Sequence, residues 1–141
     1  MAHLTLPRFC SFTLSVLLAS AASAADLRVE VRGMNSADGK CMVALFDKAQ
    51  DFARKPLQGR MEAASAAGAT VVFSGLPDGD YAISAFHDEN GNGKLDANLI
   101  GLPIERYGFS RDAAGKMGPP SFDDAKIVVR GADQSIVVNL H

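Results

Sequence analysis

Apolar and polar residues alternate with a period of two in several short stretches of this chain, as in strands with one buried face. Residues 27–32 show the alternation most cleanly, and the more apolar run 40–47 predicts a second, central strand. Turn-forming residues at 35–39 separate the two, so we expect them to form a β-hairpin. Residues 47–59 predict a helical turn or an excursion loop, and the alanine-rich run 61–68 predicts an irregular edge strand.

The middle of the chain predicts two further strands around a turn. Residues 70–73 are β-branched or aromatic, and Pro77 and Gly79 favour the backbone angles of a tight turn. Residues 81–87 then continue as a strand. One face of this strand would carry Tyr81, Ile83, Ala85 and His87, and the other face Ala82, Ser84 and Phe86.

A long segment, 99–126, separates this strand from the end of the chain. It has many glycines and prolines and no sustained periodicity, and a loop of this length in a compact domain is usually either functional or disordered. Order is favoured by apolar side chains that could pin it to the body of the domain: Leu99, Ile100, Leu102, Ile104, Tyr107, Phe109 and Phe122. The runs 127–129 and 135–140 predict a terminal hairpin.

Together these elements predict an all-β fold. We expect an immunoglobulin-like or transthyretin-like antiparallel β-sandwich of about seven strands, with Greek-key connections and one long ordered loop at 99–126.

The first 24 residues change the picture of where this domain acts. Arg8 precedes a run of apolar and small residues, which ends at an Ala-Ser-Ala site at 22–24. This pattern predicts a secretory signal peptide at 1–24 and a single domain at 25–141, located in the periplasm or outside the cell. A membrane anchor is the alternative, but the apolar run is shorter than the ~20 residues that span a bilayer, so we expect no membrane span in the mature chain.

Charge and cysteine content exclude some functions. Without Arg8 the mature chain keeps 13 basic and 16 acidic side chains, and the basic ones are scattered, so no nucleic-acid partner is expected. Of the 2 cysteines only Cys41 lies outside the leader, so no intramolecular disulfide is expected. We interpret Cys41 as a small buried residue in a strand rather than a reactive thiol.

The candidate chemistry lies in the loop that follows the strand 81–87. Oxygen-bearing side chains stand at the first, third, fifth and ninth positions of a calcium-loop pattern, with Gly93 at the sixth: Asp88, Asn90, Asn92 and Asp96. Ca²⁺ takes six to eight oxygen ligands, and the seventh position would supply the main-chain carbonyl of Lys94. The twelfth position is Leu99 rather than glutamate, so we expect weak affinity, ~10⁻⁴ to 10⁻³ M.

Other ligands and another interpretation stay open for this loop. Water or the distant acids Glu105, Asp123 or Asp124 would have to complete the coordination. Alternatively, the two Asn-Gly pairs form turns without any metal. His87 is interpreted as a hydrogen-bonding residue at a strand end, because no second histidine or usable cysteine lies nearby for zinc.

The long segment offers a second candidate site. A surface for an anionic, sugar-like or peptide ligand would use Arg106, Tyr107, Phe109 and Arg111, together with Lys116. The alternative is a segment that only caps an open end of the sandwich. Catalysis is not expected, since the chain has no nucleophile elbow, zinc-protease motif, P-loop or dinucleotide fingerprint. Asp88, Glu89 and Glu105 could pair as in sugar hydrolysis, but so small a domain has little room to enclose a substrate.

Two sets of residues resemble known families. The run F-S-G-L-P-D-G-D-Y at 73–81 resembles a corner of transthyretin-like and carboxypeptidase-regulatory-like domains. The ordered set H-D-x-N-x-N-G-K-x-D from His87, G-x-P-x-E from Gly101, G-F-S from Gly108 and G-P-P-x-F-x-x-A from Gly118 is similar to the bacterial secreted family called domain of unknown function 2141. The sequence departs at Arg111, where asparagine is expected. The resemblance implies a small exported β-sandwich and leaves its activity open.

Two hypotheses follow. The first is an exported, non-catalytic domain whose loop is ordered by weakly bound Ca²⁺. The second is a carbohydrate- or peptide-binding module that uses residues 106–122, with a cell-envelope polysaccharide or protein as partner. The oligomeric state is left open.

Overall fold

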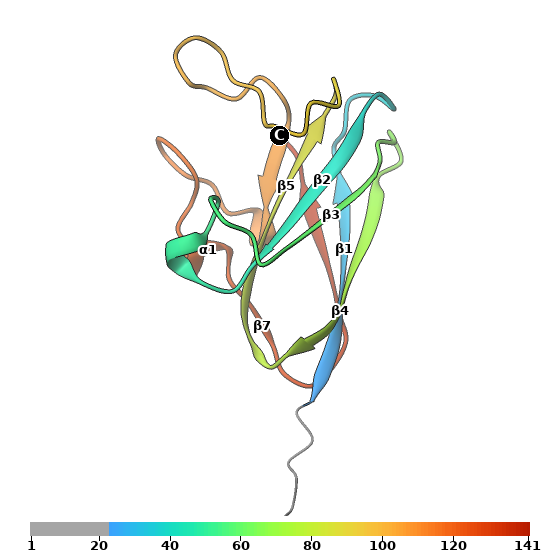
Figure 1. Cartoon of the computed structure of the whole chain (residues 1–141), viewed down its shortest axis with the longest axis vertical. Helices are drawn as coiled ribbons and strands as arrows, with labels where there is room; N and C mark the ends of the chain where they lie inside the picture. The colour runs from blue at the N-terminus through green and yellow to red at the C-terminus, as the bar shows by residue number, and fades with distance from the viewer. Residues whose placement is uncertain (1–22) are drawn as a thin grey trace, which may run out of the picture.

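The computed structural model describes residues 23–141, which form two β-sheets packed face to face (Figure 1). One sheet has three strands in the order β4-β1-β8, and the five-stranded sheet has the order β3-β2-β5-β6 with β7 also paired to β5. The elements in chain order are β1 (Ala24–Arg32), β2 (Lys40–Phe46), η1 (Ala49–Asp51), β3 (Gln58–Ala63), β4 (Ala69–Pro77), β5 (Gly79–Asp88), β6 (Tyr107–Phe109), η2 (Ser110–Asp112), α1 (Phe122–Ala125), β7 (Ile127–Val129) and β8 (Gln134–Asn139). The predicted all-β sandwich is confirmed. Apart from Ser23 and Ala24, the predicted signal peptide lies outside the described residues.

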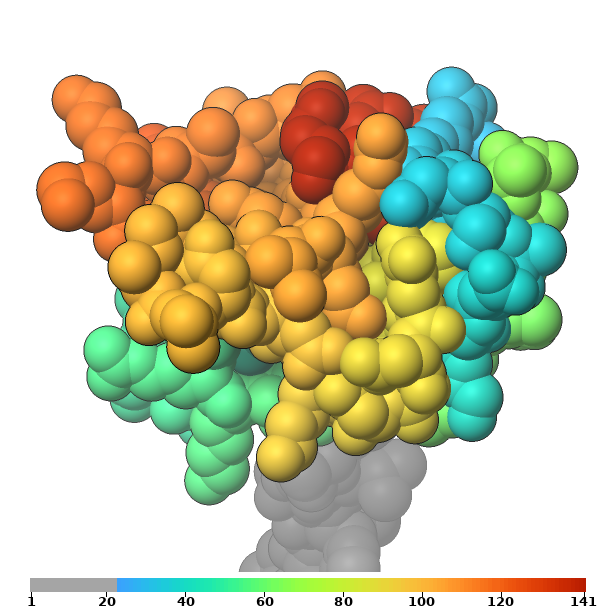
Figure 2. All heavy atoms as spheres, turned by 90° about the horizontal axis from the view of Figure 1, so that it is seen from above, coloured from blue at the N-terminus to red at the C-terminus, as the bar shows by residue number. Residues whose placement is uncertain are grey.

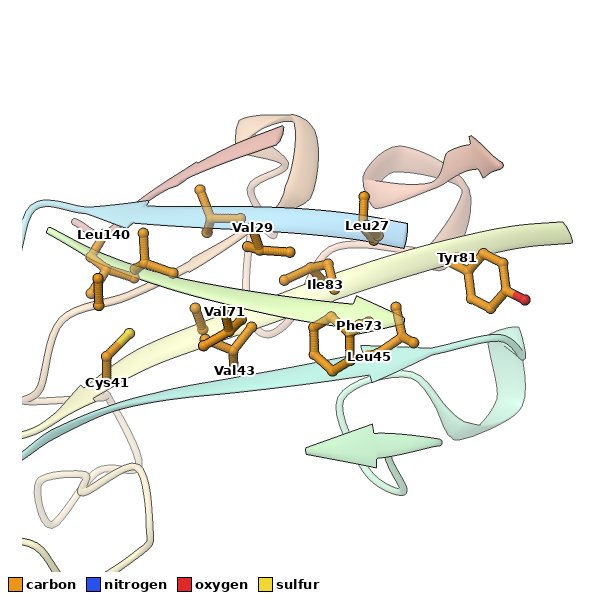
Figure 3. Close-up of a cluster of buried hydrophobic side chains, with 14 of the residues drawn as sticks. Leu27, Val29, Cys41, Val43, Leu45, Val71, Phe73, Tyr81, Ile83 and Leu140 are labelled. Atoms are coloured by element: carbon orange, nitrogen blue, oxygen red, sulfur yellow. The ribbon is translucent and has the colours of Figure 1, made fainter. Parts of the chain in front are cut away.

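The main core fills the space between the two sheets. Leu27, Val29 and Val31 of β1 are fully buried, as their alternation with charged residues predicts. Figure 3 shows Leu27 and Val29 in one layer with side chains of β2, β4 and β5, among them Phe73 and Ile83. Val31 belongs to the same buried cluster. Burying a large aliphatic or aromatic side chain contributes ~1.5–3 kcal/mol, so this layer supplies much of the stability.

The predicted hairpin between residues 27–32 and 40–47 is wrong. β1 pairs with β4 and β8, whereas β2 pairs with β3 and β5 in the other sheet. The segment between β1 and β2 therefore crosses from one sheet to the other. Alternation shows which face of a strand is buried, but it does not show which strand lies beside it.

The predicted terminal hairpin is also wrong. β7 pairs with β5 in the larger sheet, and β8 pairs with β1 in the smaller one. The pairing of β8 with β1 is parallel, so the expectation of a purely antiparallel sandwich is corrected to a mixed three-stranded sheet. Parallel neighbours require a long connection, and here it includes all of β2 to β7.

The long segment 99–126 is ordered, as expected, but only its second half packs on the body. β6 pairs with β5, and Phe109 and Phe122 join Phe46 and Phe52 in a second cluster on the outside of the larger sheet. Ser110 is fully buried there; its hydroxyl accepts a hydrogen bond from Ile83 N at 2.9 Å and donates to the Ala125 carbonyl.

The first half of the segment contradicts the expectation that its apolar side chains pin it down. Leu99, Ile100, Leu102 and Ile104 are all exposed. Two other local predictions are confirmed. The helical turn expected within 47–59 is η1, and the expected edge strand is β3 at Gln58–Ala63, slightly earlier than predicted. No helix within residues 23–141 is both long and apolar enough to cross a membrane.

Candidate metal centre

The candidate loop begins at the last residue of β5, where a buried histidine ties the strand to the turn 33–39. His87 is fully buried, and its Nε2 donates to the Asp38 carbonyl at 2.7 Å. Its Nδ1 lies 3.2 Å from Asn35 Oδ1, and the Asn35 amide in turn donates to Glu89 Oε1 at 2.8 Å. His87 therefore has the hydrogen-bonding position that its place at a strand end predicts.

Asp88 is the buried base of the loop. It is only 1% exposed, and its Oδ1 and Oδ2 accept hydrogen bonds from Asn92 N at 3.1 Å and Gly93 N at 2.8 Å. Gly93 has φ +77°, a conformation that favours glycine, so the sharp bend expected at the sixth position is present. The carboxylate thus holds the far side of the loop close to the strand end.

The other three predicted side chains meet at the Asp96 carboxylate. The Asn90 amide donates to Asp96 Oδ2 at 2.6 Å, and the Asn92 amide donates to Asp96 Oδ1 and Oδ2 at 2.9 and 3.0 Å. The amide oxygens of the two asparagines accept main-chain N–H groups two residues further on. These are Asx turns, so the turn chemistry that the sequence left open is present in this loop. Lys94 takes part through its main-chain N–H, which donates to Asn92 Oδ1 at 2.9 Å.

Glu105 closes the loop from the other end. It is 8% exposed, and its Oε1 accepts from Glu89 N at 3.1 Å while its Oε2 accepts from Asp96 N at 2.9 Å. One carboxylate therefore fastens both ends of the segment 89–96. Of the three distant acids considered as extra ligands, Glu105 lies at the loop. Asp123 and Asp124 lie on α1, where they contact Lys126 and Ser121.

The residues of the second candidate site have mainly structural contacts. The Arg106 guanidinium donates to the Gly33 carbonyl at 3.1 Å, and the Arg111 guanidinium donates to the carbonyls of Asp123 and Lys126. Phe109 is buried in the second cluster, so its ring is covered in this structure. Tyr107 is 37% exposed and packs edge-on against Phe109, whereas Lys116 lies exposed beyond η2.

A family model described as an uncharacterized protein conserved in bacteria, DUF2141, matches residues 29–137. The chain belongs to this family. The resemblance noted from its sequence motifs is thereby confirmed, and the match includes both the loop 88–96 and the long segment behind it. Searches among curated proteins and among solved structures found no match.

In this DUF2141 domain the loop carries an uncompensated negative charge. Asp88, Asp96 and Glu105 all accept hydrogen bonds from groups of residues 89–96, and within residues 23–141 none of the three forms a salt bridge with a basic side chain. The described part of the chain has no group of three or more His, Cys, Asp or Glu side chains arranged to hold a metal ion. A cation here would depend on amide and main-chain oxygens as well as carboxylates.

Sequence reasoning about this DUF2141 domain missed the contribution of the turn 33–39. Gly39 has φ +70°, and a Cβ on it would lie 1.9 Å from the Asp88 carbonyl oxygen. Asn35 and Asp38 hold His87 from the same turn. The Asp-Gly pair marked a turn, but nothing local in the sequence places that turn against a loop about fifty residues away.

Proposed function

We propose that this domain is an exported, non-catalytic module that binds one Ca²⁺ ion weakly through the loop 88–96. The observation that carries the proposal is the convergence of the Asn90 and Asn92 amides on the Asp96 carboxylate, at 2.6–3.0 Å, directly after the buried Asp88. The two ends of an amide group are nearly equivalent in shape, so rotating it by half a turn replaces a donor with an oxygen ligand. A bound cation would then take the place of the N–H groups that now face Asp96.

The charge of the loop supports the same proposal. Three carboxylates accept hydrogen bonds from residues 89–96 without a salt bridge to a basic side chain, and a divalent cation bound to the loop would interact favourably with their negative charge. Hard cations such as Ca²⁺ prefer carboxylate, amide and carbonyl oxygens, which are the groups this loop presents. The ion would stiffen the loop and steady residues 97–106, which follow directly from it.

Thermal unfolding with calcium tests the proposal. If Kd is ~10⁻⁴ to 10⁻³ M, 10 mM calcium stabilises the folded state by ~1.4–2.7 kcal/mol, and the melting temperature should rise by several degrees relative to chelator. Asp96→Asn should abolish the rise, whereas Asp47→Asn, at an exposed carboxylate outside the loop, should leave it unchanged. A flat calorimetric titration of the unaltered protein, with no change in melting, would overturn the proposal.

A groove on the larger sheet favours a second candidate, the recognition module. Its floor is a row of small residues in register on three strands, Gly59, Ala44 and Ser84. Beside it runs a row of large ones on four strands, Met61, Met42, Phe86 and Tyr107. The residues of both rows except Tyr107 line a shallow, mostly apolar hollow together with Pro56 and Arg60. Tyr107 pairs with Phe86 at the end of the large-residue row, beside the hollow.

The occupant we propose for the groove is an extended peptide or a sugar chain of the cell envelope. Aromatic and methionine side chains are adaptable contact surfaces for such ligands. Binding to purified envelope polysaccharide or protein should fall in Tyr107→Ala and persist in Val72→Ala, which removes a side chain of similar exposure from the other sheet. Equal binding by both variants would contradict this use of the groove.

A further inference from the structure

Two loops carry the four most exposed large apolar side chains of the described domain. We define the apolar tip as five residues on segments 97–104 and 113–119. Their exposed fractions are 107% for Leu99, 79% for Ile100, 57% for Leu102, 67% for Ile104 and 103% for Met117. Both segments project away from the sheets on the same side of the molecule (Figure 1). Seen from above, they lie next to one another (Figure 2).

The first of these segments is held in shape by its own hydrogen bonds. Asn98 Oδ1 accepts from Ile100 N at 3.1 Å and from Leu102 N at 3.0 Å, and Asn98 N donates to the Leu102 carbonyl at 2.8 Å. Ile104 N donates to the Asp96 carbonyl at 2.9 Å. These hydrogen bonds define the path of the main chain while the aliphatic side chains stay exposed to solvent. A defined loop that presents several apolar side chains to water marks an interaction site rather than a core segment.

The charge distribution distinguishes the apolar tip from the rest of the domain. Segment 97–104 has no charged side chain, and segment 113–119 has only Lys116. The predicted mature chain as a whole is acidic, with 13 basic and 16 acidic side chains. The tip is therefore apolar and almost uncharged, so its side chains could enter the interface of a bilayer without burying charge.

We infer that the apolar tip is a membrane-contacting surface that inserts its aliphatic side chains into the interface of a lipid bilayer. Two features favour lipid over a protein partner. The tip is convex and formed by two separate loops, so a protein would need a matching hollow for each, whereas a fluid bilayer adapts to both. Its exposed side chains are Leu, Ile and Met, while the anchors that dominate protein interfaces are mostly Trp, Tyr and Arg. This inference does not depend on calcium binding.

The absence of tryptophan from the chain allows a direct test. Leu99→Trp places one fluorophore on the tip, and Val72→Trp places one on an exposed strand of the three-stranded sheet as a matched control. The probe is vesicles of phosphatidylcholine with phosphatidylglycerol, in buffer with chelator. We expect the emission of the tip variant to shift to shorter wavelength with lipid and to be quenched by brominated acyl chains, and the control to change little.

Charge variants make the test sharper. Adding Ile100→Asp to the tip reporter should weaken vesicle partitioning by about tenfold or more, because it puts a charge where apolar area would be buried. Lys116→Glu should weaken binding to anionic vesicles and leave binding to pure phosphatidylcholine nearly unchanged. An emission spectrum that lipid does not alter would overturn the inference. A blue shift that depends on protein concentration without lipid would also overturn it, by assigning the tip to contacts between copies of this chain.

Discussion

Gly39→Ala tests how closely the turn 33–39 supports the candidate loop. A Cβ at Gly39 would lie 1.9 Å from the Asp88 carbonyl oxygen and 2.7 Å from that of Glu89, far inside contact distance. Gly75 provides a matched control, since its φ is +69° against +70° for Gly39 and nothing lies within 4 Å of its Cβ position. The two substitutions therefore share the backbone cost of a left-handed alanine and differ only in the steric conflict.

The expected magnitudes follow from that difference. A left-handed conformation costs alanine ~1–2 kcal/mol, so Gly75→Ala should lower the free energy of unfolding by about that amount. Gly39→Ala adds the displacement of main-chain atoms, which costs ~1–3 kcal/mol more. Urea denaturation at equal m-values measures both, and any calcium-induced rise in melting temperature should shrink only in Gly39→Ala. Losses that agree within ~0.5 kcal/mol would refute the close approach of the turn to the loop.

Three further predictions concern buried polar groups. Glu105→Gln removes one of the two oxygens that accept main-chain N–H groups, so urea denaturation should show a free energy of unfolding lower by ~1–3 kcal/mol. An unchanged denaturation midpoint would argue against the role of Glu105 in holding both ends of segment 89–96. Ser110→Ala leaves the Ile83 N–H and the Ala125 carbonyl without their partner and should cost ~2 kcal/mol or more by the same measurement, whereas the exposed Ser135→Ala should cost little. Burial raises the pKa of the Cys41 thiol to about 11, so a disulfide reagent near pH ~8 should modify it only after unfolding. This folded-state pKa lies above the ordinary value of 9.0, so the contribution of Cys41 to the free energy of unfolding is complete below about pH 9 and declines as the pH rises toward 11. Denaturation measured against pH should show this decline in the unaltered protein and not in Cys41→Ala.

The sequence by itself determined the local structure of this protein. Period-two alternation identified β1 and divided the residues of β5 between its two faces, because a side chain's face in a strand depends only on its position along that strand. The spacing of Asp88, Asn90, Asn92 and Asp96 around Gly93 likewise identified a loop whose side chains converge, since these contacts join residues no more than six positions apart. Whether the loop binds calcium stays a prediction.

Only the tertiary structure decided which strands pair and what surrounds the loop. β1 lies beside β8, about a hundred residues later, and β7 and β8 separate into different sheets, because pairing depends on the packing of both sheets at once. The same packing brings Gly39 and Glu105 to the loop. It also leaves Leu99 and Ile100 in water, although their apolar character predicted burial. The hydrophobicity of a side chain determines the free energy that its burial would contribute. Whether it is buried depends on whether the folded chain places another apolar surface against it.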